Sequence, residues 1–132
     1  MNKPKEAIEV LKEFLKAWKK GDFKTMYQKS QKTYKAVHRQ RKEADMECFL
    51  GSKKLTGYKI GEPVKLGTAM IEFPVEICWF LYEQQKERFQ KRIKVRLIKE
   101  IEAYKTSDNG SWGVNPISAY KEEEITEVKN EG

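Results

Sequence analysis

The stretch from Pro4 to Tyr34, PKEAIEVLKEFLKAWKKGDFKTMYQKSQKTY, does most to define the fold of this chain. Apolar residues recur there at three- and four-residue steps, which is the spacing of one helix face: Ala7, Val10, Leu11, Phe14 and Trp18. Gly21 suits a helix end because glycine tolerates the left-handed conformation. The stretch therefore predicts a helix from Pro4 to the Gly-Asp step.

A second helix is predicted after this step, with Asp22 as its N-cap, because an aspartate side chain can accept from the free N–H groups of a first turn. One side of this helix is less apolar than the first helix: Phe23, Met26, Tyr27, Ser30, Tyr34 and Val37. A short third helix is expected around Met46 to Leu50, ended by Gly51, with the break between the two helices inside residues 38–43.

The second half of the chain is rich in β-formers. A first strand is expected around Tyr58 and Ile60, stopped by Gly61. A second runs from Leu66 to Tyr82, with one apolar face at its odd positions from Ile71 to Trp79 and one mixed face. Pro74 lies inside this run and cannot donate to a ladder, so it requires a bulge or a position facing an edge.

Residues 88–104 are compatible with both a helix and a strand. As a strand, Phe89, Ile93, Val95, Leu97, Ile101 and Ala103 share one face, with Arg88, Arg92, Lys94, Arg96, Glu100 and Glu102 on the other. As a helix, Phe89, Ile93, Leu97, Ile101 and Tyr104 form a stripe. We favour the strand because Val95 fits only that pattern. A turn at Ser107 to Gly110 then leads to a last short strand over residues 111–120, with Trp112 and Val114 on one face.

Composition limits the class of protein. The 132 residues suffice for one domain, and the absence of a long apolar run or an apolar leader predicts a cytoplasmic protein without a membrane span, unless a leader was removed. Residues 1–42 carry thirteen basic and four acidic side chains, so the net charge of +7 is concentrated there. Cys48 and Cys78 are expected to be free, buried thiols rather than a disulfide.

The order of helix, Gly-Asp, helix, short helix and four strands resembles the nuclear transport factor 2-like superfamily, which includes ketosteroid isomerase, scytalone dehydratase and the SnoaL-like polyketide cyclases. The matching residues are the step from Ala17 through Asp22 to Phe23, then Met26-Tyr27, and the closing segment from Trp112 to Ile117. The resemblance implies an α+β, cystatin-like cone, in which N-terminal helices pack on a strongly curved four-stranded antiparallel sheet. It also implies a pocket inside the cone and frequent dimers through the outer sheet face. One domain would cover residues 1–120, and residues 121–132 would be a charged, frayed tail.

Enzymes of this superfamily place a general acid or base inside the cone, and the expected strand register offers little of that kind. Its inward positions hold no carboxylate and only Lys91 and Lys99 as charges. The glutamates would face outward, beside arginine and lysine on the neighbouring strand, where cross-strand ion pairing is the simpler explanation. A single histidine, His38, excludes a two-histidine metal site, and its simplest interpretation is a solvated residue. No phosphate-binding glycine loop is present. Without a two-histidine site and without this loop, neither a metal nor a cofactor is expected.

Two candidate surfaces remain. A ligand pocket with apolar walls and a few polar groups is predicted from residues Trp18, Tyr27, Ser30, Tyr34, His38, Tyr58 and Trp79. Apolar residues on the outer sheet face predict a homodimer interface: Met70, Pro74, Cys78, Phe80, Tyr82 and Ile98.

Three functional hypotheses follow. The first is a non-catalytic dimeric domain that binds a small apolar ligand. The second is an isomerase, dehydratase or cyclase that uses Tyr27, Tyr34 or His38. The third is a domain that binds nucleic acid or an acidic protein through its basic helices, and we favour the first.

Overall fold

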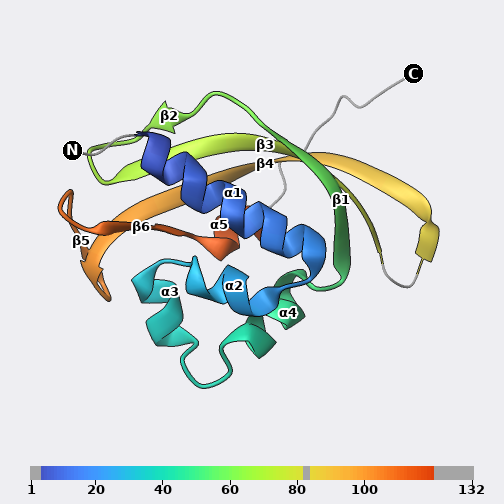
Figure 1. Ribbon diagram of the computed structural model, residues 1–132, viewed down its shortest axis with the longest axis horizontal. Helices are drawn as coiled ribbons and strands as arrows, with labels where there is room; N and C mark the ends of the chain where they lie inside the picture. Colours follow the sequence, from blue (N-terminus) through green and yellow to red (C-terminus); the bar gives the residue numbers. More distant parts are fainter. Residues whose placement is uncertain (1–3, 82–83, 121–132) are drawn as a thin grey trace.

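The computed structural model describes residues 4–81 and 84–120, and in them the chain is an α+β protein whose helices pack on a curved antiparallel sheet (Figure 1). The helices of this part of the chain are α1 (Pro4–Lys20), α2 (Phe23–Gln28), α3 (Lys32–Val37), α4 (Glu43–Leu50) and α5 (Pro116–Tyr120). Its strands are β1 (Lys53–Ile60), β2 (Val64–Lys65), β3 (Met70–Leu81), β4 (Gln84–Glu102), β5 (Lys105–Thr106) and β6 (Ser111–Val114).

The sheet is built around the long antiparallel pair of β3 and β4. Strand β1 lies beside β3, and the short β2 continues along the same side of β3, while β5 and β6 pair with the last part of β4. The described sheet thus has six strands, not the predicted four. Two of the six are only two residues long, which is too short to produce a readable alternation of apolar and polar residues.

Helix α1 lies across one face of this sheet, and its apolar stripe forms the centre of the core (Figure 1). Leu11, Phe14 and Trp18 are at most 1% exposed and belong to one cluster with the inward residues of β3 and β4. The predicted end of this helix is confirmed, because Gly21 has a φ of 77°. Asp22 caps α2 as predicted, and hydrogen bonds from Thr25 lower the pKa of its carboxyl group.

The predicted second helix is two helices, because its middle is used as a strand-like link. Gln31 N donates to Val114 O at 2.9 Å, and Val114 N donates to Lys29 O at 2.9 Å, so residues 29–31 run beside β6. The backbone groups of these residues cannot make both these bonds and helical ones. The predicted break within residues 38–43 and the short helix after it are confirmed by α4.

The alternation predicted for β3 is confirmed, since Ile71, Phe73, Val75, Ile77 and Trp79 are all buried. Residues 84–102 form β4, so the strand interpretation of the ambiguous segment is the right one. The register between the two strands is continuous past Pro74, without a bulge there. Pro74 faces the gap between β1 and β2, where its carbonyl accepts a hydrogen bond from Gly61 N at 2.7 Å, so its missing N–H removes no ladder bond.

The end of β4 departs from the predicted pattern. Ile101, expected in the core, is 52% exposed, and Glu100, expected in solvent, is 2% exposed. The pairing of β4 with β5 shifts register between Glu100 and Glu102, so the simple two-residue alternation does not continue through this end.

Of the remaining predictions about the fold, some are confirmed and others are wrong. Cys48 and Cys78 are free thiols, but Cys48 is exposed on α4 and Cys78 is half-buried, so the prediction that they are buried is wrong. The turn at residues 107–110 is confirmed by a hydrogen bond from Gly110 N to Ser107 O. The last strand, predicted over residues 111–120, ends at Val114, and residues 116–120 form helix α5 instead, so this part of the prediction is wrong. Tyr82 and the predicted tail at residues 121–132 lie outside the described residues.

No helix in the described ranges is both long and apolar enough to cross a membrane.

Candidate functional site

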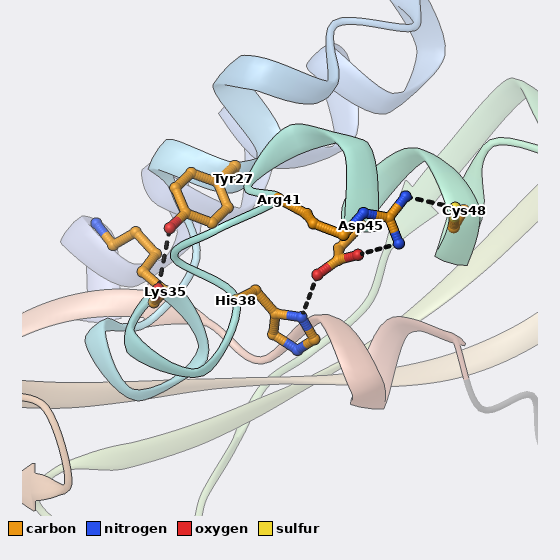
Figure 2. A network of polar contacts seen from close by, with 6 residues as sticks. All are labelled: Tyr27, Lys35, His38, Arg41, Asp45 and Cys48. Carbon is orange, nitrogen blue, oxygen red and sulfur yellow. Dashed lines mark hydrogen bonds and ion pairs between the residues drawn. The ribbon is translucent and has the colours of Figure 1, made fainter.

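Three of the predicted pocket residues lie together on the short helices. Tyr34 of α3 contacts Tyr27 of α2 edge to face, with ring centroids 6.4 Å apart, and stacks on His38 at 4.2 Å. Tyr27 is fixed by its hydroxyl, which donates to Lys35 O at 3.0 Å (Figure 2). The ring contact between Tyr27 and Tyr34 and the hydrogen bond from Tyr27 to the backbone of Lys35 join α2 to α3 at this cluster.

His38 is tied to α4 by a carboxylate. Its Nδ1 lies 2.8 Å from Asp45 Oδ2, and Arg41 Nη1 lies 3.0 Å from the other oxygen, Asp45 Oδ1 (Figure 2). Arg41 also donates from Nη2 to Cys48 Sγ at 3.7 Å. The His38 side chain is 31% exposed, so it is neither the fully solvated residue of the simplest interpretation nor a core residue.

This arrangement can hold a proton donor and an acceptor side by side. If Nδ1–H donates to Asp45, a neutral His38 presents Nε2 as an acceptor on the opposite side of its ring. Burial, with smaller contributions from Asp45 and Tyr27, raises the pKa of Tyr34 to about 12, so its hydroxyl stays protonated at neutral pH. Asp45, however, divides its two oxygens between His38 and Arg41.

The other predicted pocket residues lie apart from this cluster. Trp18 is in the core, and its Nε1 donates to Lys53 O at 3.2 Å. Ser30 is 3% exposed and donates to Met26 O at 2.9 Å. Trp79 stacks on Phe89 with ring centroids 4.4 Å apart. The structure therefore brings Tyr27, Tyr34 and His38 together and leaves Trp18, Ser30 and Trp79 in separate packing roles.

Tyr58, the last of the predicted pocket residues, lies beside α1 on the outside of the molecule. It lines an open groove of about 770 Å³ with the exposed side of that helix: Glu9, Lys12, Glu13, Lys16, Lys19 and Lys20. Four lysines against two glutamates give the groove a positive charge, and Glu13 already pairs with Lys29 at 2.8 Å.

Sequence reasoning missed a buried carboxylate at the end of β4. Glu100 accepts hydrogen bonds from Gln31 Nε2 at 2.8 Å, from Thr33 N at 3.0 Å and from Thr33 Oγ1 at 2.5 Å. Thr33 Oγ1 in turn accepts from Tyr104 N at 2.7 Å. The carboxylate thus holds the first turn of α3, whose N-cap residue Gln31 makes no side-chain cap. No local sequence signal joins residues this far apart in the chain.

The outer face of the β3–β4 pair carries the predicted ion pairs. Arg96 Nε lies 3.0 Å from Glu72 Oε2, and Arg92 Nη2 lies 3.8 Å from Glu76 Oε2. A shallow groove of about 450 Å³ crosses this face beside Pro74.

The apolar residues of the predicted dimer face are mostly accessible. Met70, Pro74, Cys78 and Phe80 are half-buried. Ile98 is only 9% exposed, so it is closed off already within one chain and contributes little to the proposed contact surface.

Within residues 4–81 and 84–120, no three histidine, cysteine, aspartate or glutamate side chains come together as a metal site. No protein-family model matches the sequence, and a search of curated proteins gives no significant match.

Proposed function

We propose that this chain is a non-catalytic, nuclear transport factor 2-like domain that forms a homodimer through the outer face of β3 and β4. The observation that carries this proposal is the contrast between the two sheet faces. Helix α1 covers one face, whereas Met70, Pro74 and Cys78 on the other face remain half-exposed (Figure 1). An apolar strip of this kind on a regular sheet is typical of a surface that another subunit covers.

The charges on this face support a second copy of the same chain as the partner. Strand β3 presents Glu72 and Glu76, and the neighbouring β4 presents Arg92 and Arg96. A two-fold axis through the face can place the acidic row of one copy opposite the basic row of the other, as an isologous interface requires.

The non-catalytic assignment rests on how the carboxylates are used. Glu100 makes three hydrogen bonds within the fold, and both oxygens of Asp45 have partners. A general base needs an oxygen or nitrogen that can reach a substrate proton. In this cluster, His38 Nε2 is the atom that best meets this requirement. An acid–base enzyme that uses His38 is therefore our alternative hypothesis, which we favour less than the dimer.

The small apolar ligand has weaker support than the dimer. Phe14, Trp18 and Phe73 fill the space between α1 and the sheet and are at most 1% exposed. Large apolar side chains packed in this way stabilise the cone through contacts with one another, rather than through contacts with a ligand.

The dimer is tested by measuring the mass of the protein in solution by light scattering after size exclusion. We expect twice the mass of the chain for the natural sequence. Cys78→Lys places a charge in the centre of the strip and should yield monomers with an unchanged circular dichroism spectrum. Ser52→Lys adds the same charge at an exposed position off this face and should remain dimeric. A monomeric natural protein at high micromolar concentration, or a dimeric Cys78→Lys variant, would contradict the proposal.

The groove beside α1 favours a second candidate function, binding of single-stranded nucleic acid. Lys12, Lys16, Lys19 and Lys20 can contact phosphates, and Tyr58 offers a ring for base stacking in the same groove. Lysines along a backbone with an aromatic platform are the general means of such binding.

The nucleic-acid hypothesis predicts strong salt dependence. Fluorescence anisotropy with a short oligonucleotide should show affinity falling by about tenfold or more between low and physiological salt. A Lys12→Glu, Lys16→Glu double variant should lose binding, whereas Lys105→Glu, on β5, should not. Affinity that ignores salt, or that survives the double variant, would argue against this function.

A further inference from the structure

Strand β1 forms one edge of the described sheet, where it pairs with β3 alone (Figure 1). In an antiparallel pair, every second residue exchanges hydrogen bonds with the neighbouring strand, and the residues between direct their N–H and C=O groups away from it. Gly61 N donates to Pro74 O at 2.7 Å, which fixes this alternation. The regular register from Gly57 to Ile60 then turns the backbone groups of Tyr58 and Ile60 away from β3, towards the open edge.

These outward groups have no hydrogen-bond partner within residues 4–81 and 84–120. An unpaired edge of this kind is a template to which a further strand can be added, with backbone hydrogen bonds supplying the affinity. Tyr58 and Ile60 together offer two donors and two acceptors, which another peptide backbone can match. Phosphate groups offer acceptors alone and would leave both carbonyls without donors, so this edge favours a peptide over a nucleic acid.

The groove beside α1 lies on the side to which an added strand would direct half of its side chains. Tyr58 and Ile60 are paired with Ile77 and Val75 of β3, which are buried on the face that α1 covers. Tyr58 therefore faces the same side, and it lines the groove of about 770 Å³ with the exposed side of α1. A strand paired with β1 would direct every second side chain to this side, towards the lysines of α1.

The charges around the edge select the chemistry of the added strand. The groove has four lysines against two glutamates, and one of these glutamates, Glu13, already pairs with Lys29. Strand β1 itself carries Lys53, Lys54 and Lys59 and no acidic residue. Pairing with β1 of a second copy would bring like charges together, which is unfavourable.

We propose that the open edge of β1 binds an acidic segment of a partner protein, which adds to the sheet as a further strand and places its carboxylates against the lysines of α1. The backbone pairing is made by Tyr58 and Ile60, and the charge selection by Lys12, Lys16, Lys19 and Lys20. This site is separate from the outer face of β3 and β4, so the proposal does not depend on the homodimer.

Hydrogen exchange followed by NMR tests the edge directly. The probe is a synthetic octapeptide of alternating glutamate and threonine, blocked at both ends, whose glutamates share one face of a strand. In the free chain the amides of Tyr58 and Ile60 should exchange quickly, and saturating peptide should slow both by about tenfold or more. The Gly61 amide is already bonded to Pro74 O and serves as the internal reference, which should not change.

Variants separate backbone pairing from charge. Ile60→Pro removes one outward donor at an edge position where proline is tolerated, so the affinity for the labelled peptide in fluorescence anisotropy should fall by about tenfold or more. Ile60→Val keeps this N–H and should bind nearly as tightly as the natural chain. Lys12→Gln combined with Lys16→Gln should weaken binding about fivefold, whereas Lys105→Gln, on β5 at the other side of the sheet, should have no effect. If Ile60→Pro does not fold, the same peptide with every backbone nitrogen methylated keeps its charge, cannot donate and should not bind.

Several outcomes would contradict the proposal. It is wrong if the peptide does not bind, if it binds without slowing exchange at Tyr58 and Ile60, or if Ile60→Pro binds as tightly as the natural chain. An oligonucleotide of equal charge that binds more tightly than the peptide would assign the groove to nucleic acid instead. Exchange at these two amides that slows with rising protein concentration, without peptide, would assign the edge to a second copy. Binding that requires Glu122, Glu123 and Glu124 all to be changed to Gln would assign it to the acidic end of the chain itself.

Discussion

At the scale of single residues, Lys99 and Glu100 are consecutive buried charges that different parts of the chain stabilise. Lys99 is held by Asp108 and Trp112, whereas Glu100 is held by Gln31 and Thr33. Removing a charge from water is costly unless it is well hydrogen-bonded. Glu100 meets this requirement because it accepts hydrogen bonds from three donors. Since Lys99 and Glu100 have different partners, the contribution of Glu100 to stability can be measured separately from that of Lys99.

Glu100→Gln should destabilise the fold by about 2 kcal/mol, because the amide has one acceptor oxygen in place of two and directs N–H groups at donors. Urea unfolding followed by circular dichroism measures the change. Glu102→Gln is the matched control two residues along the same strand, with a side chain that is 63% exposed, and should change stability by less than about 0.5 kcal/mol. Equal effects of the two variants would show that the Glu100 hydrogen bonds contribute nothing specific.

Tyr34 gives the protein a pH dependence at alkaline pH. Burial raises the pKa of its hydroxyl from 10.0 to about 12, so the folded chain holds this proton more tightly than the unfolded chain. The stability that depends on this group is fully present below pH 10 and is lost as pH rises from 10 towards 12. Difference absorbance between the natural chain and Tyr34→Phe should isolate one tyrosine that ionises near pH 12, and ionisation near pH 10 would contradict its burial.

Individual residues were the part of the site least accessible from sequence. Of the predicted mixed face of Tyr27, Ser30, Tyr34 and His38, the rings of Tyr27, Tyr34 and His38 contact one another, whereas Ser30 donates to Met26 O instead. The partner of His38, Asp45, was not predicted, since it lies on the next helix. The alternation along β4 predicts a solvent-exposed Glu100. Such alternation carries no information about another segment of the chain, here the one with Gln31 and Thr33, that covers the outer side of the end of this strand.

At the scale of elements, residues 29–31 interrupt what the sequence presents as one helix. The spacing of apolar residues continues from α2 into α3, so periodicity alone cannot locate the break. Its cause is the pairing of this link with β6, which is a contact between distant parts of the chain. The long elements α1 and β3 were predictable because their patterns extend over many residues. The pattern of β4 also fits a helix, and only Val95 favoured the strand, while β2, β5 and α5 were too short for a pattern.

Gly113 of β6 is essential to this pairing. A Cβ atom at Gly113 would lie 2.4 Å from Gln31 Cα, a backbone atom that cannot move aside without breaking the link. Gly113→Ala should therefore destabilise the protein by about 2 kcal/mol or more through overpacking. A Cβ atom at Gly57 of β1 would meet nothing within 4 Å, so Gly57→Ala is the control and should have a small effect. Chemical denaturation of both variants makes the comparison, and similar stabilities would rule out a tight contact at Gly113.

At the scale of the whole molecule, the α+β class follows from the order of the patterns, with helical periodicity in the first half of the chain and alternation in the second. The curvature of the sheet and the closeness of α3 to the end of β4 depend on pairings that no local pattern contains. The charge follows the same division. The basic excess of residues 1–42 includes the lysines of α1, while the outer sheet face balances its charges in pairs.

The bridge between Ser30 and Val114 has a consequence for biosynthesis. The ribosome synthesises the chain from its N-terminus. Helices α1 and α2 therefore emerge long before β6, the strand that pairs with residues 29–31. Glu100, which anchors the start of α3, also emerges late. Until Val114 has left the exit tunnel, the nascent chain exposes the apolar face of α1 without its complete sheet, which is the condition under which chaperones bind.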